Sequence, residues 1–123
     1  MKKLLLVGLM MLAGSAWAKW VMYDRNESMT YYFDPSTVRK DGNMRRVWEL
    51  QNFTKRDNDG VMSLRSRQEY DCKQERYRFL SGSTHTETMA GGEVLGTAGE
   101  DNDWTAIPPG AAVEIILKIV CAK

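Results

Sequence analysis

The sequence predicts an α+β domain, in which an antiparallel sheet of about six strands in meander-like order carries a C-terminal helix on one face. Three observations predict this fold. Short segments in which apolar and polar residues alternate recur between turn residues over most of the chain. A helical apolar stripe follows two prolines near the C-terminus. Two cysteines, Cys72 and Cys121, lie one in each region, so a disulfide is expected to staple the helix to the sheet.

Residues 1–18 have the pattern of a cleavable signal peptide. Lys2 and Lys3 precede an apolar stretch, residues 4–13, that is too short to span a bilayer. Small residues at Ala16 and Ala18 fit a cleavage site. We therefore expect residues 19–123 to form one exported domain, with an uncleaved N-terminal anchor as the alternative. No cysteine follows the apolar stretch to accept a lipid, and no other segment reaches transmembrane length.

Strands and turns alternate through the first half of the mature chain. "KWVMYDR" and "MTYYFD" are expected strands, and Pro35 ends the second because proline cannot donate to a ladder. "DPSTV" predicts a tight turn or a single helical turn, and Asp41-Gly42 predicts a turn before the next strand. That strand, "MRRVWELQNF", has apolar residues on both faces, so we expect both to be partly covered.

The segment from Met62 to Cys72 alternates clearly. Cys72 shares its side of the strand with Met62, Leu64 and Tyr70, which places it toward the core. The other side carries charge and is expected to face solvent; its residues are Ser63, Arg65, Arg67, Glu69 and Asp71. The following residues, 76–98, predict a long strand, a turn at Gly91-Gly92 and a partner strand.

The C-terminal segment, residues 111–121, allows two interpretations. Alternating Val113, Ile115, Leu117 and Ile119 are typical of a strand. Apolar residues at helical spacing, with a Glu114–Lys118 pair on another face, are typical of a helix instead. These apolar residues form a stripe: Val113, Ile116, Leu117, Val120 and Cys121. We favour the helix, which would lay Cys121 against the sheet.

Export makes a Cys72–Cys121 disulfide the simplest interpretation of the two cysteines. The bridge would close a loop of 49 positions, which contributes about 4 kcal/mol in the chain-entropy description. A zinc site is the weaker alternative, because two thiols and His85 leave the four-ligand set incomplete. An intermolecular bridge, giving a homodimer, is a further alternative.

The sequence contains no recognisable catalytic, cofactor or metal motif. His85 is the only histidine, it falls in an expected strand, and we expect it at the surface. There is no G-x-S-x-G turn and no glycine-rich phosphate loop. The formal net charge of +1 gives no basic excess, which argues against a nucleic-acid partner. These features favour a non-enzymatic protein that binds another protein and needs no cofactor.

Arginines are the candidate partner-binding residues, because arginine is favoured at interfaces and can hold a carboxylate with two hydrogen bonds. The competing interpretation is a solvated sheet face with mixed cross-strand charge pairs. The six candidates are Arg45, Arg46, Arg65, Arg67, Arg76 and Arg78.

Several segments, taken in order, resemble the surface-adhesin protein E family of Gram-negative bacteria. They are "KWVMYDRN", "YYFDPSTVRKDG", "VWEL", "SLRSRQEYDC", "YRFLSG", "TMAGGEVL", "DWTAIPPG" and the terminal "IVC". The resemblance covers essentially all of the mature chain. It implies an exported antiparallel sheet with a C-terminal helix, in which Cys72 and Cys121 match the family's paired cysteines. It also implies adhesion to host extracellular-matrix or cell-surface components, and no catalytic motif.

Two functions therefore stand as expectations. The first is that of an exported binding protein that acts as an adhesin. The second is a periplasmic structural or accessory protein that binds an envelope component of its own cell, which the missing lipidation cysteine favours. The expected location is correspondingly the periplasm or the cell surface.

Overall fold

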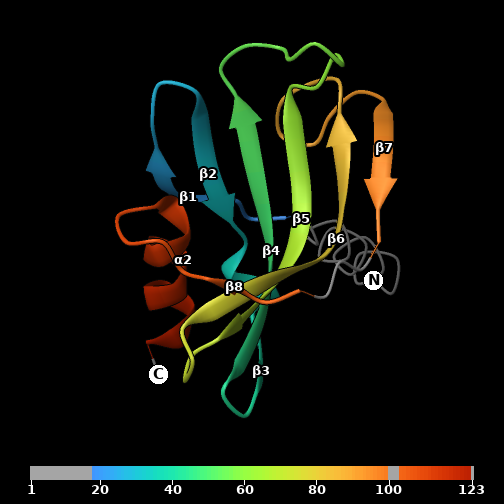
Figure 1. The fold of residues 1–123 in the computed structure, drawn as a ribbon. Coiled ribbons are helices and arrows are strands. Elements are labelled where there is room, and N and C mark those ends of the chain that lie inside the picture. The colour runs from blue at the N-terminus through green and yellow to red at the C-terminus, as the bar shows by residue number, and fades with distance from the viewer. Residues whose placement is uncertain (1–17, 100–102, 123) are drawn as a thin grey trace, which may run out of the picture.

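A curled antiparallel sheet forms the body of the protein (Figure 1). The computed structural model describes residues 18–99 and 103–122, so the expected signal peptide lies outside the described residues except for its last position. The main path of the sheet runs β1-β2-β4-β5-β6-β7, and β3 and β8 pair with β4 and β6. This order confirms the predicted meander. The strands are β1 (Val21–Arg25), β2 (Met29–Phe33), β3 (Arg39–Asp41), β4 (Met44–Phe53), β5 (Ser63–Asp71), β6 (Arg76–His85), β7 (Val94–Ala98) and β8 (Thr105–Ala106).

The connections follow the predicted turn chemistry. After β2, a short 3₁₀ helix, η1 (Pro35–Thr37), starts at Asp34, whose carboxylate accepts a hydrogen bond from the Ser36 backbone N–H at 3.0 Å. Gly42 then adopts a positive φ of 57° in the tight turn between β3 and β4, a conformation that costs glycine least. The chain thus reverses where the sequence indicated.

Residues 112–121 form a helix, α2 (Ala112–Cys121), so the strand interpretation of this segment is wrong. The helix buries Ile116, Leu117 and Val120, three members of the predicted stripe, against Phe33 and neighbouring sheet residues. Burying one continuous stripe removes more apolar surface from water than an exposed edge strand could.

Two contacts hold the C-terminal end of α2 to the sheet. Cys72, just after β5, is bonded to Cys121 with an S–S distance of 2.01 Å and a Cα–Cα distance of 5.7 Å. Beside this bridge, the Arg45 Nε donates a hydrogen bond to the Val120 carbonyl at 3.1 Å, satisfying an acceptor that the helix end leaves open. The predicted staple is therefore confirmed.

The predicted solvent exposure of the β5 charges is wrong for two residues. Glu69 and Asp71 are each only 2% exposed, although their strand side was expected to face solvent. Arginines on the neighbouring strands cover them: Glu69 pairs with Arg46 and Arg78, and Asp71 with Arg76. Burying an ionised carboxylate is tolerated here because each one has a charged, hydrogen-bonded partner.

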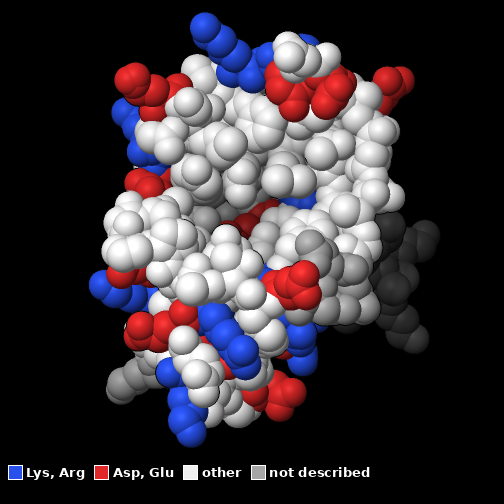
Figure 2. Space-filling view, viewed as in Figure 1, with Lys and Arg blue, Asp and Glu red and all other residues white. Residues whose placement is uncertain are grey.

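The molecule is unevenly charged across its surface. Figure 2 shows, in the view of Figure 1, a centre that is largely uncharged and hollowed, with charged side chains gathered around the rim and the lower end.

Within the described residues, no helix combines the length and apolar character needed to cross a bilayer.

Candidate functional site: an arginine pocket

Antiparallel pairing brings distant charged residues into cross-strand rows. Arg46 of β4 pairs with Glu69 of β5, which in turn pairs with Arg78 of β6. Since side chains at paired positions project from the same face, the carboxylate stands between the two guanidinium groups. Arg67 occupies the same face one row along, because it lies two residues from Glu69 on β5.

Glu69 is clamped by both neighbouring arginines. Its Oε2 accepts a hydrogen bond from the Arg46 Nε at 3.0 Å. Its Oε1 lies 2.8 Å from the Arg78 Nε and 2.6 Å from the Arg78 Nη2. The Glu69 side chain is 3% exposed, whereas those of Arg46 and Arg78 are 36% and 28% exposed. The guanidinium groups therefore form the surface, and the carboxylate lies beneath them.

A cavity of about 380 Å³ opens over this cluster. We call it the arginine pocket and define it by its lining residues: Arg46, Arg67, Glu69, Arg78, Leu80, Ser81 and Gly99. A β-bulge helps to shape it, since the β5–β6 register shifts between Arg67 and Gln68. The pocket carries three formal positive charges and one negative charge.

Arg67 is the arginine of this pocket that has no ion pair among the residues that the structure describes. Among residues 18–99 and 103–122, no hydrogen bond or ion pair engages its side chain, and the residue is half-buried. A half-buried guanidinium without a partner retains five N–H donors for a ligand.

An aromatic platform lies beside the pocket. β8 pairs with the start of β6, and Trp104, the residue before β8, stacks under two arginines of β6. The Cζ atoms of Arg76 and Arg78 lie 4.5 and 4.3 Å from the centre of its ring. Such cation–π contacts fix the plane of each guanidinium group.

The other three predicted arginines lie outside the pocket. Arg45 projects to the opposite face of β4 and holds the end of α2. Arg65 covers Trp48, with its Cζ 4.0 Å from the ring centre. Arg76 Nε donates to Asp71 Oδ2 at 3.0 Å, in addition to stacking on Trp104. The structure thus gathers three of the six candidates, Arg46, Arg67 and Arg78, into one pocket.

Hydrogen bonds set the protonation behaviour of Asp71. Burial on its own would raise the pKa of this carboxyl group. The opposing effects are larger in sum: backbone N–H groups of Gln74 and Lys73 and the side chain of Arg76 stabilise the charged form and lower its pKa. Asp71 therefore stays ionised and holds Arg76 in place at neutral pH.

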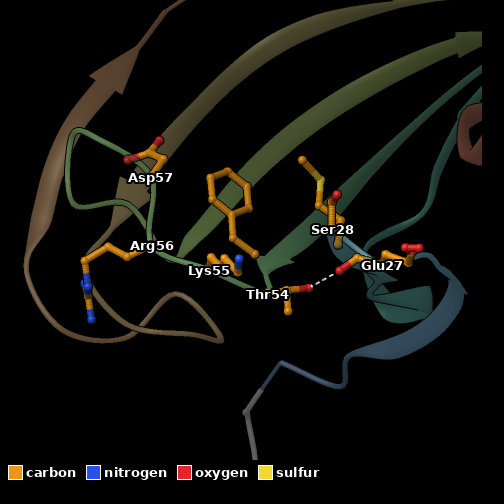
Figure 3. Close-up of a pocket in the computed structure, with 8 residues that line it drawn as sticks. Glu27, Ser28, Thr54, Lys55, Arg56 and Asp57 are labelled. Atoms are coloured by element: carbon orange, nitrogen blue, oxygen red, sulfur yellow. Dashed lines mark hydrogen bonds between the residues drawn. The ribbon is translucent and has the colours of Figure 1, made fainter.

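A second pocket lies where the β1–β2 turn meets the loop after β4 (Figure 3). Its volume is about 470 Å³, and the Thr54 hydroxyl closes one side by donating to the Glu27 carbonyl at 2.8 Å. Glu27 and Asp57 balance Lys55 and Arg56 around it. Arg56 also donates to the Gly60 and Thr86 carbonyls, so its donors already connect loops. This pocket offers a ligand no net charge.

His85 does not lie at the surface as predicted; it is 7% exposed at the end of β6. Its Nε2 lies 2.7 Å from the Ser83 hydroxyl, and burial together with the charge of Arg65 lowers its pKa. A nucleophilic triad also requires a carboxylate on the ring, but the buried Glu49 and Glu69 have other partners. No group of three or more possible metal ligands comes together in the described part of the chain.

The sequence did not predict a buried carboxylate, Glu49, on the sheet face that carries α2. Glu49 is 5% exposed and accepts hydrogen bonds from the hydroxyls of Tyr23, at 2.9 Å, and Tyr70. Burial raises its pKa to about 7, although both hydrogen bonds act in the opposite direction. Burial and the nearby Glu49 charge likewise raise the pKa of both tyrosines.

Two residues of the candidate site were also missed. Glu69 was expected to face solvent, and the sequence suggested no role for Trp104. The strand alternation around Glu69 gave its face but not the arginines opposite it, which depend on register. No local pattern marks Trp104 as a platform, because its partners on β6 lie more than 25 positions away.

Comparison with known proteins shows a similarity to surface-adhesin sequences. A family model described as "Surface-adhesin protein E" matches residues 20–122. No curated protein gives a significant match. Two structures of Haemophilus influenzae protein E are similar in fold: one has 13% identity and a TM-score of 0.61, covering 88% of this chain and 87% of that chain. Its crystal form II has 14% identity and a TM-score of 0.60, covering 87% and 97%.

Proposed function

The chain belongs to the surface-adhesin protein E family, and from this membership we propose that it is a non-enzymatic, exported surface protein that binds a protein partner. The partner is a host extracellular-matrix or cell-surface component. The observation that carries the proposal beyond the family is the arginine pocket. There Arg67 has no partner within the described part of the chain, and it lies beside two fixed guanidinium groups.

Physical chemistry supports the use of this face for recognition. Arginine combines charge, a flat stacking surface and paired N–H donors, which is why it is enriched at protein interfaces. The protein holds Arg46 and Arg78 in place through the buried Glu69, so little side-chain entropy remains to be lost on binding. Pre-positioned donors of this kind favour affinity and specificity together.

A binding panel tests the proposal. The purified domain, residues 19–123, is applied to immobilised extracellular-matrix proteins and, in parallel, used to capture proteins from an envelope extract of the producing bacterium. We expect saturable binding to at least one matrix protein. Binding to envelope components alone would reject the host partner and favour the accessory role in the cell's own envelope.

The arginines also permit a test of the face. Charge reversal at Arg67 should weaken binding to the matrix protein, because it places a carboxylate beside Glu69. The same reversal at Arg25, on the edge strand β1, changes the net charge equally and serves as the matched control. Equal loss in both variants would show that total charge, rather than this face, governs binding.

A further inference from the structure

Counted over the described residues, 18–99 and 103–122, the arginine pocket has more positive charge than its own carboxylate can balance. Glu69 supplies one negative charge to Arg46, Arg67 and Arg78. Arg46 also lies 3.7 Å from Asp41, but at the outer rim, where the Asp41 side chain is 75% exposed and well solvated. Half-buried positive charges without a counter-charge favour an anionic ligand.

The pocket's guanidinium groups are positioned for in-plane hydrogen bonds. Each has five N–H donors, and the bonds to Glu69 use the Nε of Arg46 and the Nε and Nη2 of Arg78. Trp104 stacks on the flat face of Arg78 at 4.3 Å, so the in-plane donors of that group that Glu69 does not use stay uncovered by the ring. The geometry suits a planar group with two acceptor oxygens, such as a carboxylate.

The surrounding charges argue against a long polyanion. Two acidic side chains interrupt the basic residues around the pocket: Asp41, at the end of β3, lies 3.7 Å from Arg46, and Asp71 pairs with Arg76. An extended sulfated chain or a nucleic acid would be repelled by the exposed carboxylate of Asp41, and Arg76 offers it little attraction because Asp71 already neutralises that charge. A short acidic segment of a folded protein can place one or two carboxylates in the pocket and avoid them.

We propose that the arginine pocket binds the carboxylate side chains of an acidic segment in the partner protein, with Arg67 as the principal contact. This inference rests on the proposed function, because it names the chemistry that the partner must present. Arg67 approaches the ligand directly, whereas Arg46 and Arg78 reach it while held by Glu69. Trp104 and Glu69 act as positioning residues.

Fluorescence anisotropy with a fluorescein-labelled hexaglutamate peptide tests the proposal on residues 19–123. Three proteins are compared at constant ionic strength: the native sequence, Arg67→Gln, and Arg25→Gln as a control of equal charge. Because Arg67 has no partner among the described residues, its substitution should leave folding unchanged. We expect Arg67→Gln to weaken binding about tenfold or more, the effect of losing a charge-assisted hydrogen bond, and Arg25→Gln less than about twofold.

Three results would overturn the proposal. The first is no saturable binding of hexaglutamate up to about 1 mM, the range of the weakest specific complexes. The second is an equal loss in the two arginine variants. The third is a sulfated hexasaccharide that binds more tightly than the peptide and depends equally on Arg67, which would identify a glycan site instead.

Failure of the proposal that the arginine pocket binds an acidic segment can be distinguished from failure of the proposed function. If the native domain binds a matrix protein and Arg67→Gln binds it equally well, adhesion stands and this pocket is not the contact. If hexaglutamate binding depends on Arg67 but no matrix protein binds, the pocket is an acid-binding site and the host partner is wrong.

Discussion

Glu49 should make the folded domain less stable as pH rises through neutrality. Its carboxyl group is 5% exposed and contacts the hydroxyls of Tyr23 and Tyr70 on the face that carries α2. Burial raises the pKa from 4.5 to about 7 in the folded protein. The folded state therefore binds a proton that the unfolded state has already released between these two pH values.

The sign and size follow from linkage. The contribution of Glu49 to the unfolding free energy is fully present below pH 4.5. It is lost as the pH rises to and through about 7, because the unfolded carboxyl group ionises readily whereas the buried one holds its proton. A shift from 4.5 to about 7 corresponds to about 3 kcal/mol of unfolding free energy in total. Between pH 5 and pH 8, the expected loss is roughly 2 to 3 kcal/mol, since part of the titration lies below pH 5.

Urea unfolding at pH 5 and pH 8 measures this effect in the native sequence and in Glu49→Gln. The amide keeps polar contact with the two tyrosines but does not titrate, so the Glu49 contribution to the pH dependence should vanish. His85 acts in the opposite direction, because its lowered pKa makes the folded state more stable as pH rises. His85 is common to both proteins, and its effect cancels in the comparison.

Glu27→Gln is the matched control, since Glu27 lies exposed in the turn between β1 and β2. It should follow the native pH dependence. The reasoning is refuted if Glu49→Gln loses as much stability between pH 5 and pH 8 as the native protein does. An identical curve for all three proteins would mean that Glu49 ionises in the folded state as easily as in water.

Two further predictions concern packing and the staple. Replacing both Cys72 and Cys121 by alanine should lower the unfolding free energy by about 4 kcal/mol, and reduced native protein should show the same urea midpoint as that variant. Gly82→Ala should cost about 1 to 3 kcal/mol, because its Cβ would lie 2.9 Å from the Arg65 carbonyl oxygen and from Phe79 Cε1. Gly96→Ala is the control, since its nearest contact would be an ordinary 3.5 Å from Thr84. Equal thermal midpoints for the two glycine variants would contradict the packing shown at Gly82.

The helix was predictable because its signal is local, and the staple because the chain has two cysteines. Val113, Ile116 and Leu117 repeat at helical spacing, and α2 packs on the sheet through this stripe. Two cysteines leave one intramolecular pairing, which the structure confirms. The positions of strands followed from alternation and turn residues in the same way. Local periodicity therefore identified the elements and their order.

The charge network was less predictable because it depends on register. Alternation told which side of β5 Glu69 occupies, but only the β4–β5 and β5–β6 pairings place Arg46 and Arg78 beside it. The bulge between Arg67 and Gln68 shifts that register, and no residue pattern in the sequence indicates the bulge. The sequence therefore predicted six arginines as one binding surface. The structure places three of them, Arg46, Arg67 and Arg78, in one pocket and the other three outside it.

Protease accessibility on intact cells tests most directly the claim that this is a surface protein with an external partner. Cells producing the protein are treated with a protease that cannot cross the outer membrane, and a known periplasmic protein is followed as a control. Surface display predicts digestion of the protein while the control stays intact. Protection of both until the outer membrane is broken would contradict an external adhesin and direct the search to partners inside the envelope.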